Sequence, residues 1–225
     1  MQMTIRMVVG VAVAAAVVLG SARAADEKVP LKLELPKPML AGTPKPIPAS
    51  VPCEPELVNK RPDFMVPAGC VNLSKGKKIT GSDKEPVVGE LTLITDEDKS
   101  AEEGSYVELA AGKQWVQLDL GQSSELYALL VWRFHSQKRV HHSVVVQVCD
   151  DADFIKDVKT VFNTDRENAH GLGVGKDLGF IENYQGQLID MKGAKGRYVR
   201  LYSNGNTSNN MNHYIEVEAW GKAAK

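Results

Sequence analysis

The chain has 225 residues, of which 43% are hydrophobic and 24% are charged, and its formal net charge is -1 at pH 7. Its length fits one domain with appendages or two small domains, and the near-zero charge disfavours nucleic-acid binding through bulk electrostatics. Ten of the eleven prolines lie between Pro30 and Pro67, whereas thirteen of the fourteen aromatic residues lie between Tyr106 and Trp220. A proline-rich part that cannot build a core therefore precedes a part that can.

Residues 1–24 are typical of a secretory signal peptide. Arg6 precedes the apolar run 7–19, and Ala22-Arg23-Ala24 supplies small residues for cleavage after Ala24. The apolar run is too short to span a bilayer, which takes about 20 residues. We therefore expect an exported protein, secreted or periplasmic, without membrane insertion.

Residues 25–71 are predicted to form a linker or strap. Their prolines favour extended polyproline II conformations, which suit a semi-rigid spacer or a strap along a surface. A proline-rich ligand for another protein is the alternative. Cys53 and Cys70 flank a short loop, and in an exported chain we expect them to form a disulfide that stabilises the fold by ~3 kcal/mol on the chain-entropy model. Cys149 ends an apolar strand and is predicted to be a buried small hydrophobic residue.

From Asn72 to Gly221 the sequence is typical of short β-strands bounded by Gly, Asn or Asp. The strand-like runs are VVGELTLIT, QWVQLDLG, ELYALLVWRFH, SVVVQVCD, GRYVRLYS and HYIEVEAWG. LYALLVWRF is apolar on both faces, which predicts a central strand covered on both sides. Helix is expected only in short pieces, around 151–158 and 123–125. The predicted fold class is all-β, an antiparallel β-sandwich or jelly roll over 72–221, with 222–225 as a tail.

Six segments in this region match one family in order. They are NLSKGKKITGS at 72–82, ITDED at 94–98, WVQLDLG at 115–121, VQVCDDADF at 146–154, RYVRLY at 197–202 and EVEAWG at 216–221. Together they resemble the discoidin, or coagulation-factor type C, domain family, and also uncharacterised secreted bacterial discoidin-like proteins. The resemblance implies a galactose-binding-like sandwich that binds carbohydrate or an extracellular partner and does no chemistry itself.

The acidic loop at 96–100 is a candidate calcium site. It presents side-chain oxygens at alternate positions, and Ca²⁺ takes about six to eight oxygen ligands. The resemblance implies a structural Ca²⁺ here, completed by a glutamate of the last strand. Glu97 stands where the family usually has glycine, and a solvated acidic turn is the alternative. The candidate ligands are Asp96, Asp98, Ser100 and Glu216, with Glu218 as the alternative glutamate.

Polar side chains around the turn 136–140 and in the Asn-rich loop 203–213 form a candidate ligand edge. Sugars need planar or charged hydrogen-bond donors beside an aromatic face. The candidate ligand-binding residues are Arg133, His135, Arg139, His142, Asn204, Asn206 and Asn209. Neighbouring His141 and His142 must point to opposite faces of a strand, so at most one serves this site. The alternative is ordinary turns, with Trp132 and Phe134 in the core.

The sequence contains no GxSxG, HExxH or Cys/His signature, and we expect no enzymatic activity. It predicts an exported, non-catalytic carbohydrate-binding module with calcium as a structural ion. Galactosides, or cell-envelope and matrix polysaccharides, are the expected ligand class. The alternative is an extracellular adhesion or structural protein that binds another protein through the sandwich and the proline-rich strap.

Overall fold

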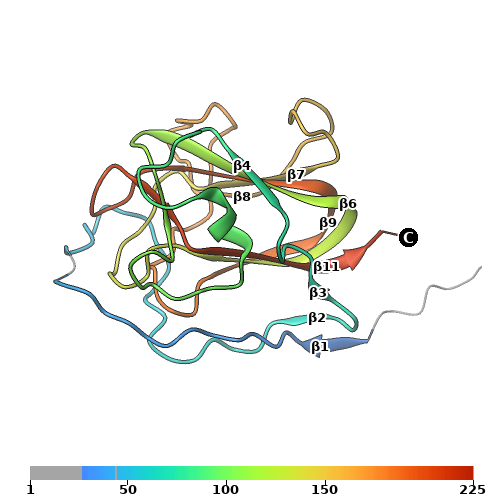
Figure 1. Ribbon diagram of the computed structural model, residues 1–225, viewed down its shortest axis with the longest axis horizontal. Coiled ribbons are helices and arrows are strands. Elements are labelled where there is room, and N and C mark those ends of the chain that lie inside the picture. Colours follow the sequence, from blue (N-terminus) through green and yellow to red (C-terminus); the bar gives the residue numbers. More distant parts are fainter. Residues whose placement is uncertain (1–26, 44, 225) are drawn as a thin grey trace, which may run out of the picture.

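Two long strands organise the fold. The computed structural model describes residues 27–43 and 45–224, so the predicted signal peptide lies outside the described residues. β6 (Lys113–Trp132) and β9 (Gln187–Asn204) pair antiparallel along most of their length. Irregular register at two points of β6 bends the pair. Each long strand therefore contributes to both layers of a sandwich (Figure 1).

The remaining strands extend these two layers. The first layer adds β4 (Lys78–Gly81), β7 (Val145–Cys149) and β8 (Lys159–Asn163), and the second adds β3 (Val71–Asn72) and β11 (Glu216–Ala223). A separate pair is formed by β5 (Val107–Leu109) and β10 (Asn212–Tyr214). Every pairing between these strands is antiparallel, and the predicted all-β sandwich is confirmed.

The central strand is covered on both faces, as its apolar sequence predicts. Leu129 and Val131 are fully buried in the core between the layers. Leu130 and Trp132 point to the opposite face because side chains alternate along a strand, and they too are fully buried. What covers this second face is not another sheet of the sandwich but the proline-rich segment.

The proline-rich segment forms a strap on the second layer, where its strands β1 (Lys28–Pro30) and β2 (Met65–Pro67) pair with each other. Val29, Leu31 and Leu33 are half-buried and alternate with exposed residues. They pack on the apolar cluster that contains Leu130 and Trp132. Figure 1 shows the strap passing beneath the sandwich and turning at the end opposite to the C-terminus. The described strap residues thus complete the core of the sandwich.

The predicted Cys53–Cys70 disulfide is not formed, because Cys53 carries a free thiol. Cys53 lies beside Gly179 through an isolated β-bridge. Cys70 follows β2 and packs against the second apolar cluster. The strap runs the length of the sandwich between these two positions, which keeps the two side chains apart (Figure 1). Cys149 is 2% exposed, as predicted for a small buried residue.

Three local predictions are wrong. The run VVGELTLIT is not a strand, because Gly89 turns the chain with a φ of 71° and η1 (Leu91–Thr95), a 3₁₀-helix, follows. The region 151–158 is a turn in which the Asp151 carboxylate accepts hydrogen bonds from three backbone N–H groups. Residues 123–125 belong to β6. Within the described part of the chain, no helix has the length and apolarity required to cross a membrane.

Candidate functional site

Three loops meet at one end of the sandwich, and we call residues 133–144, 178–186 and 205–211 together the loop end. The first and third loops are joined by the hydrogen bond from His142 N to Gly205 O at 2.9 Å. The first and second are joined by Glu182 N and Arg139 O, also at 2.9 Å. The strand ends therefore bring side chains that are 40 to 70 positions apart in the sequence into one place.

A buried charge network lies inside the loop end. Arg133 Nη1 donates to Glu182 Oε1 at 3.3 Å and to Gln187 Oε1 at 2.8 Å, and His141 Nδ1 lies 3.2 Å from the same Glu182 oxygen. Burial raises the pKa of Glu182 to about 7, although Arg133 acts in the opposite direction. Burial, assisted by Arg133, holds the pKa of His141 well below its ordinary value. This network connects two of the loops from inside.

An aromatic group lies above this network. The Phe134 and Tyr106 rings are half-buried and meet edge to face with their centroids 5.0 Å apart. The Arg139 guanidinium lies 4.4 Å from the Phe134 centroid. His213 lies 5.5 Å from Phe134 and bonds Glu108 at 2.7 Å. Burial and the nearby Arg139 lower the pKa of His213 to about 4, so its imidazole is neutral at pH 7.

The predicted arginines and His135 come together at the loop end, but they are more deeply buried than the sequence indicates. Arg133, His135 and Arg139 are 1%, 2% and 4% exposed. Arg133 belongs to the internal network, and His135 Nε2 lies 2.9 Å from the Lys99 carbonyl oxygen. Of these three residues, Arg139 is the one that stacks on a half-buried ring, that of Phe134. His141 is buried and His142 half-buried, in keeping with their opposite directions on the strand.

The asparagines of the third loop differ in what they do. Asn206 is 5% exposed, and its amide bonds Asn209 Oδ1, Met211 O and two backbone N–H groups, so it shapes the turn. Asn209 is exposed and Asn204 half-buried at the rim. Asn212, which the sequence did not single out, is buried and donates to Ala110 O and Gly112 O.

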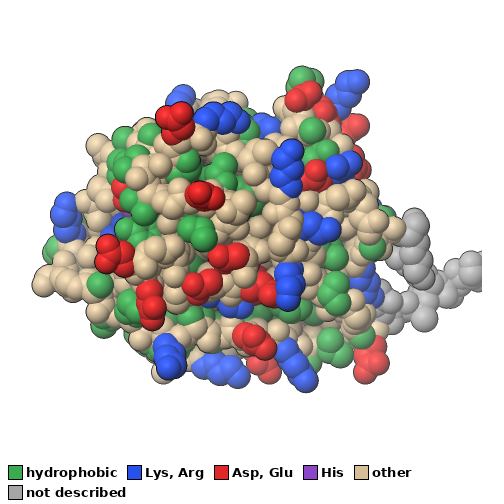
Figure 2. Space-filling view, viewed as in Figure 1, with side chains coloured by type: hydrophobic (Ala, Val, Ile, Leu, Met, Phe, Trp, Pro, Cys, Tyr) green, Lys and Arg blue, Asp and Glu red, His purple; other side chains and the backbone are tan. Residues whose placement is uncertain are grey.

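The acidic loop after η1 keeps the turn expected of a glycine. Glu97 has a φ of 73°, a left-handed conformation that costs a non-glycine residue about 1 kcal/mol or more. Its backbone N–H donates to Glu216 Oε2 at 3.2 Å, and its side chain pairs with Lys75 at 2.6 Å. Asp98 accepts from the Ser100 N–H at 2.8 Å. Figure 2 shows acidic side chains gathered on the face that carries η1.

Glu216 connects this loop to the last strand. It is fully buried, and its Oε1 has no hydrogen-bond partner in the described part of the chain. Burial, together with the charges of Glu218 and Asp96, raises the pKa of Glu216 to about 9. Glu218 bonds Lys99 at 2.7 Å instead, so Glu216 is the better candidate ligand. Within 27–43 and 45–224, no three His, Cys, Asp or Glu side chains converge to hold a metal, and a cation here would rely on backbone oxygens as well.

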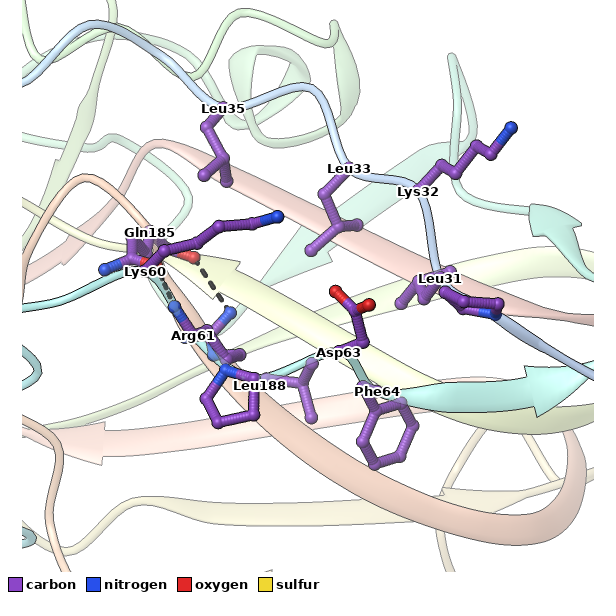
Figure 3. Close-up of a pocket in the computed structure, with 12 residues that line it drawn as sticks. Leu31, Lys32, Leu33, Leu35, Lys60, Arg61, Asp63, Phe64, Gln185 and Leu188 are labelled. Atoms are coloured by element: carbon purple, nitrogen blue, oxygen red, sulfur yellow. Dashed lines mark hydrogen bonds between the residues drawn. The ribbon is translucent and has the colours of Figure 1, made fainter.

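A cavity of about 280 Å³ lies between the two legs of the strap, residues 27–39 and 59–71 (Figure 3). None of the predicted ligand residues lines it. Leu33 and Leu35 come from the first leg, and Leu188 from β9 forms part of the floor. Arg61 of the second leg donates to the carbonyl oxygens of Gln185, at 3.1 Å, and Gly186. The sequence did not reveal this cavity, because the two legs come together only in the folded chain.

Several residues in or beside the loop end also escaped sequence reasoning. Tyr106, Glu108 and Glu182 lie in no recognisable motif and are far in sequence from the arginines that they accompany. His213, the last residue of the Asn-rich loop 203–213, lies inside a predicted segment, although it was not itself a candidate. The signal for the others is tertiary proximity.

Comparisons with known proteins bear on the fold. No family model and no curated relative matches the chain. A family 89 glycoside hydrolase from Clostridium perfringens is 16% identical, with a TM-score of 0.51, over 68% of this chain and 15% of that chain. A chitosan-binding module of a Paenibacillus chitosanase/glucanase is 18% identical, with a TM-score of 0.48, over 67% of this chain and 99% of that module. A Streptococcus pneumoniae fucose binding module is 20% identical, with a TM-score of 0.48, over 66% of this chain and 96% of that module. The chain thus spans a small part of the hydrolase that it matches, and the similarity to that hydrolase shows a shared fold.

Proposed function

We propose that the protein is an exported, non-catalytic module that binds carbohydrate at the loop end. Galactosides, or cell-envelope and matrix polysaccharides, are the ligand class that we propose. The observation that carries the proposal is the meeting of two half-buried rings, Phe134 and Tyr106, with the Arg139 guanidinium. A sugar offers an apolar C–H face and a polar hydroxyl edge, and this combination supplies a partner for each.

Each group has a distinct part in this proposal. The rings of Phe134 and Tyr106 accept the apolar face of the sugar, and Arg139 retains an Nε donor without a partner. Glu108 supplies a carboxylate acceptor held in place by neutral His213. The internal network of Arg133 and Glu182 holds the loops in register and does not itself touch the sugar.

Calcium is part of the same proposal as a structural ion. The buried Glu216 Oε1 is the observation that fits a cation, because it has no partner among the described residues and a buried polar atom without a partner is costly. Glu216 would hold the ion together with oxygens of the loop 96–100, Asp96, Asp98 and Ser100 being the sequence candidates. The ion would tie the loop to the last strand, and Glu97 already forms the required turn.

Protein binding through the strap stays the alternative prediction. The apolar side chains of the strap legs, such as Leu31 and Leu33, are packed on the sandwich itself. A partner would therefore have to use the outer surface of the strap or the sandwich.

The central experiment is a glycan array that displays galactosides and cell-envelope polysaccharides, followed by affinity electrophoresis. Phe134→Ala is the test variant and Phe154→Ala its matched control, because Phe154 is also half-buried and stacks on an arginine, Arg200, at 4.0 Å. Phe134→Ala should weaken binding about tenfold, as expected for the loss of one stacking ring, and Phe154→Ala should not. A wild-type protein that retains no glycan, with or without Ca²⁺, would overturn the proposal.

The calcium part is tested by thermal unfolding in CaCl₂ and in EDTA. The wild type should melt at a higher temperature in CaCl₂, because an ion that binds only the folded state stabilises it. Glu216→Gln should abolish this difference, whereas Glu85→Gln, at an exposed glutamate of another loop, should preserve it. Equal melting temperatures of the wild type in the two buffers would rule the ion out.

A further inference from the structure

The two legs of the strap are anchored by apolar packing. The first leg, residues 27–39, and the second, residues 59–71, supply the side chains that cover Leu130 and Trp132. Their backbones are joined by the β1–β2 pairing and by Leu31 N donating to Phe64 O at 2.8 Å. Arg61 adds hydrogen bonds to the sandwich, drawn in Figure 3. Releasing either leg would expose this apolar cluster to water.

The middle of the strap is held differently. We call residues 40–43 and 45–58 the crossing, and among the described residues neither apolar cluster includes any of them. Lys45 donates to Ser208 O at 2.7 Å in an exposed contact. Lys138 and Glu56 pair at 2.6 Å, with side chains 45% and 37% exposed. Exposed ion pairs contribute little stability, so the crossing is the weakly held part of the strap.

The backbone contacts of the crossing fall on the loop end. Ala41 N donates to Ser136 O at 2.8 Å, Glu54 N donates to Gly179 O at 2.8 Å, and Gly179 N donates to Pro52 O at 2.9 Å. Figure 1 shows the strap turning at this end of the sandwich.

These contacts interleave with the predicted ligand residues. Ser136 lies between His135 and Arg139, and Ser208 lies between Asn206 and Asn209. Arg139 itself donates to Gln137 Oε1 at 2.7 Å, and Gly42 of the crossing packs close to the Gln137 amide. The crossing is thus bonded to the rim of the proposed sugar site.

We propose that the crossing is the resident occupant of the loop end and that a saccharide binds only when the crossing moves away while the legs stay anchored. This inference rests on the proposed function of the same site. The crossing bonds Ser136, the neighbour of His135. His135 and Arg139 are deeply buried, and each has one nitrogen without a partner among the described residues. The apparent affinity for the saccharide is then reduced by the fraction of molecules in which the crossing is displaced.

An engineered disulfide tests the proposal directly. A Cβ added at Gly179 would lie 3.6 Å from the Cys53 Cβ, within the range of natural disulfides. The same Cβ would lie 2.7 Å from a methyl group of Val140, so the variant combines Gly179→Cys with Val140→Ala. Adding Cys53→Ser gives a control that keeps both substitutions but cannot form the disulfide. We call the variant that retains Cys53 the lock, which is oxidised when the disulfide is formed. Mass spectrometry under oxidising and reducing conditions verifies the bond.

Binding to the array of galactosides and envelope polysaccharides is then measured with and without reductant. The oxidised lock should bind at least tenfold more weakly than its reduced form, and the Cys53→Ser control should be insensitive to reductant. An oxidised lock that binds as tightly as the control overturns the gating. If neither the control nor the wild type binds any glycan, the proposed function fails, and the gating fails with it.

Hydrogen exchange of the unmodified protein supplies a second measurement. The glycan retained on the array should speed exchange of the Ala41 and Glu54 amides, which bond across to the loop end. The Leu31 amide, which bonds within the legs, should be unchanged. Equal or slower exchange at Ala41 and Glu54 with the glycan bound would contradict displacement of the crossing.

Discussion

Gly186 lies against the ring of Trp132, and its substitution by alanine tests how tightly the strap, the loop end and the central strand are joined. An added Cβ would lie 2.7 Å from Trp132 Cε2 and 2.9 Å from Cδ2 and Nε1. The ring is fully buried, and its Nε1 donates to Tyr184 O at 2.9 Å. The Trp132 ring therefore cannot shift without displacing its neighbours, because protein interiors are closely packed.

The magnitude follows from two contributions. Gly186 has a φ of 66°, and placing a side chain in this left-handed region costs about 1 kcal/mol or more. Overpacking a filled core costs roughly 1–3 kcal/mol in addition. Gly76 is the matched control, since its φ is 62° and no atom of the described residues lies within 4 Å of an added Cβ. Gly76→Ala should thus cost about 1 kcal/mol and Gly186→Ala about 3 kcal/mol.

The assay is urea unfolding monitored by tryptophan fluorescence. The free energies of unfolding are compared between variants whose unfolding free energy depends on urea concentration with the same slope. Thermal unfolding should show the same ranking, at roughly 2–4 °C per kcal/mol for a chain of this size. If Gly186→Ala costs no more than Gly76→Ala, the Trp132 ring is free to shift, and the tight packing of the loop end against the central strand is refuted.

Two further changes probe the strap and the buried network. Val66 lies in β2 and is 2% exposed, so Val66→Ala should lower the free energy of unfolding by about 2 kcal/mol. Val87 is 58% exposed, and Val87→Ala should change it by less than about 0.5 kcal/mol. Equal losses of the two variants in urea titrations would show that the strap is not part of the core. Glu182 has a pKa of about 7 in the folded protein, above its ordinary 4.5, so its contribution to stability is complete below pH 4.5 and is lost as the pH rises through 7. The wild type should therefore lose about 3 kcal/mol more than Glu182→Gln over this interval, and parallel stability curves would show that Glu182 titrates normally.

Much of the fold is predictable from local patterns. In Trp115–Leu120 the apolar residues alternate with polar ones, and the structure buries Val116, Leu118 and Leu120 on the inner face. The central strand was recognised because it is apolar at successive positions. The run 87–95 was wrongly predicted as a strand because its apolar residues are compatible with one. Gly89 turns the chain there with a φ of 71°, and a side chain is excluded because an added Cβ would lie 2.4 Å from Tyr106 O.

The site was predicted only in part. Arg133 and Arg139 were identified as functional candidates by residue type, but residue type does not reveal that buried Arg133 bonds Glu182 and that Arg139 stacks on Phe134. The Cys53–Cys70 disulfide was inferred from their closeness in sequence, and the path of the strap separates them.

The sequence by itself determined that a proline-rich segment precedes an aromatic, β-rich sandwich, that one face of the alternating strand Trp115–Leu120 is buried, and that the central strand is covered on both faces. These properties follow from composition and from the alternation of side chains along a strand, which need no knowledge of partners. Only the tertiary structure decided that the strap completes the core and crosses the loop end, and that Tyr106, Phe134 and Arg139 meet there. The physical reason is that such contacts join residues far apart in the chain, so they depend on how the strands bend and where the loops return.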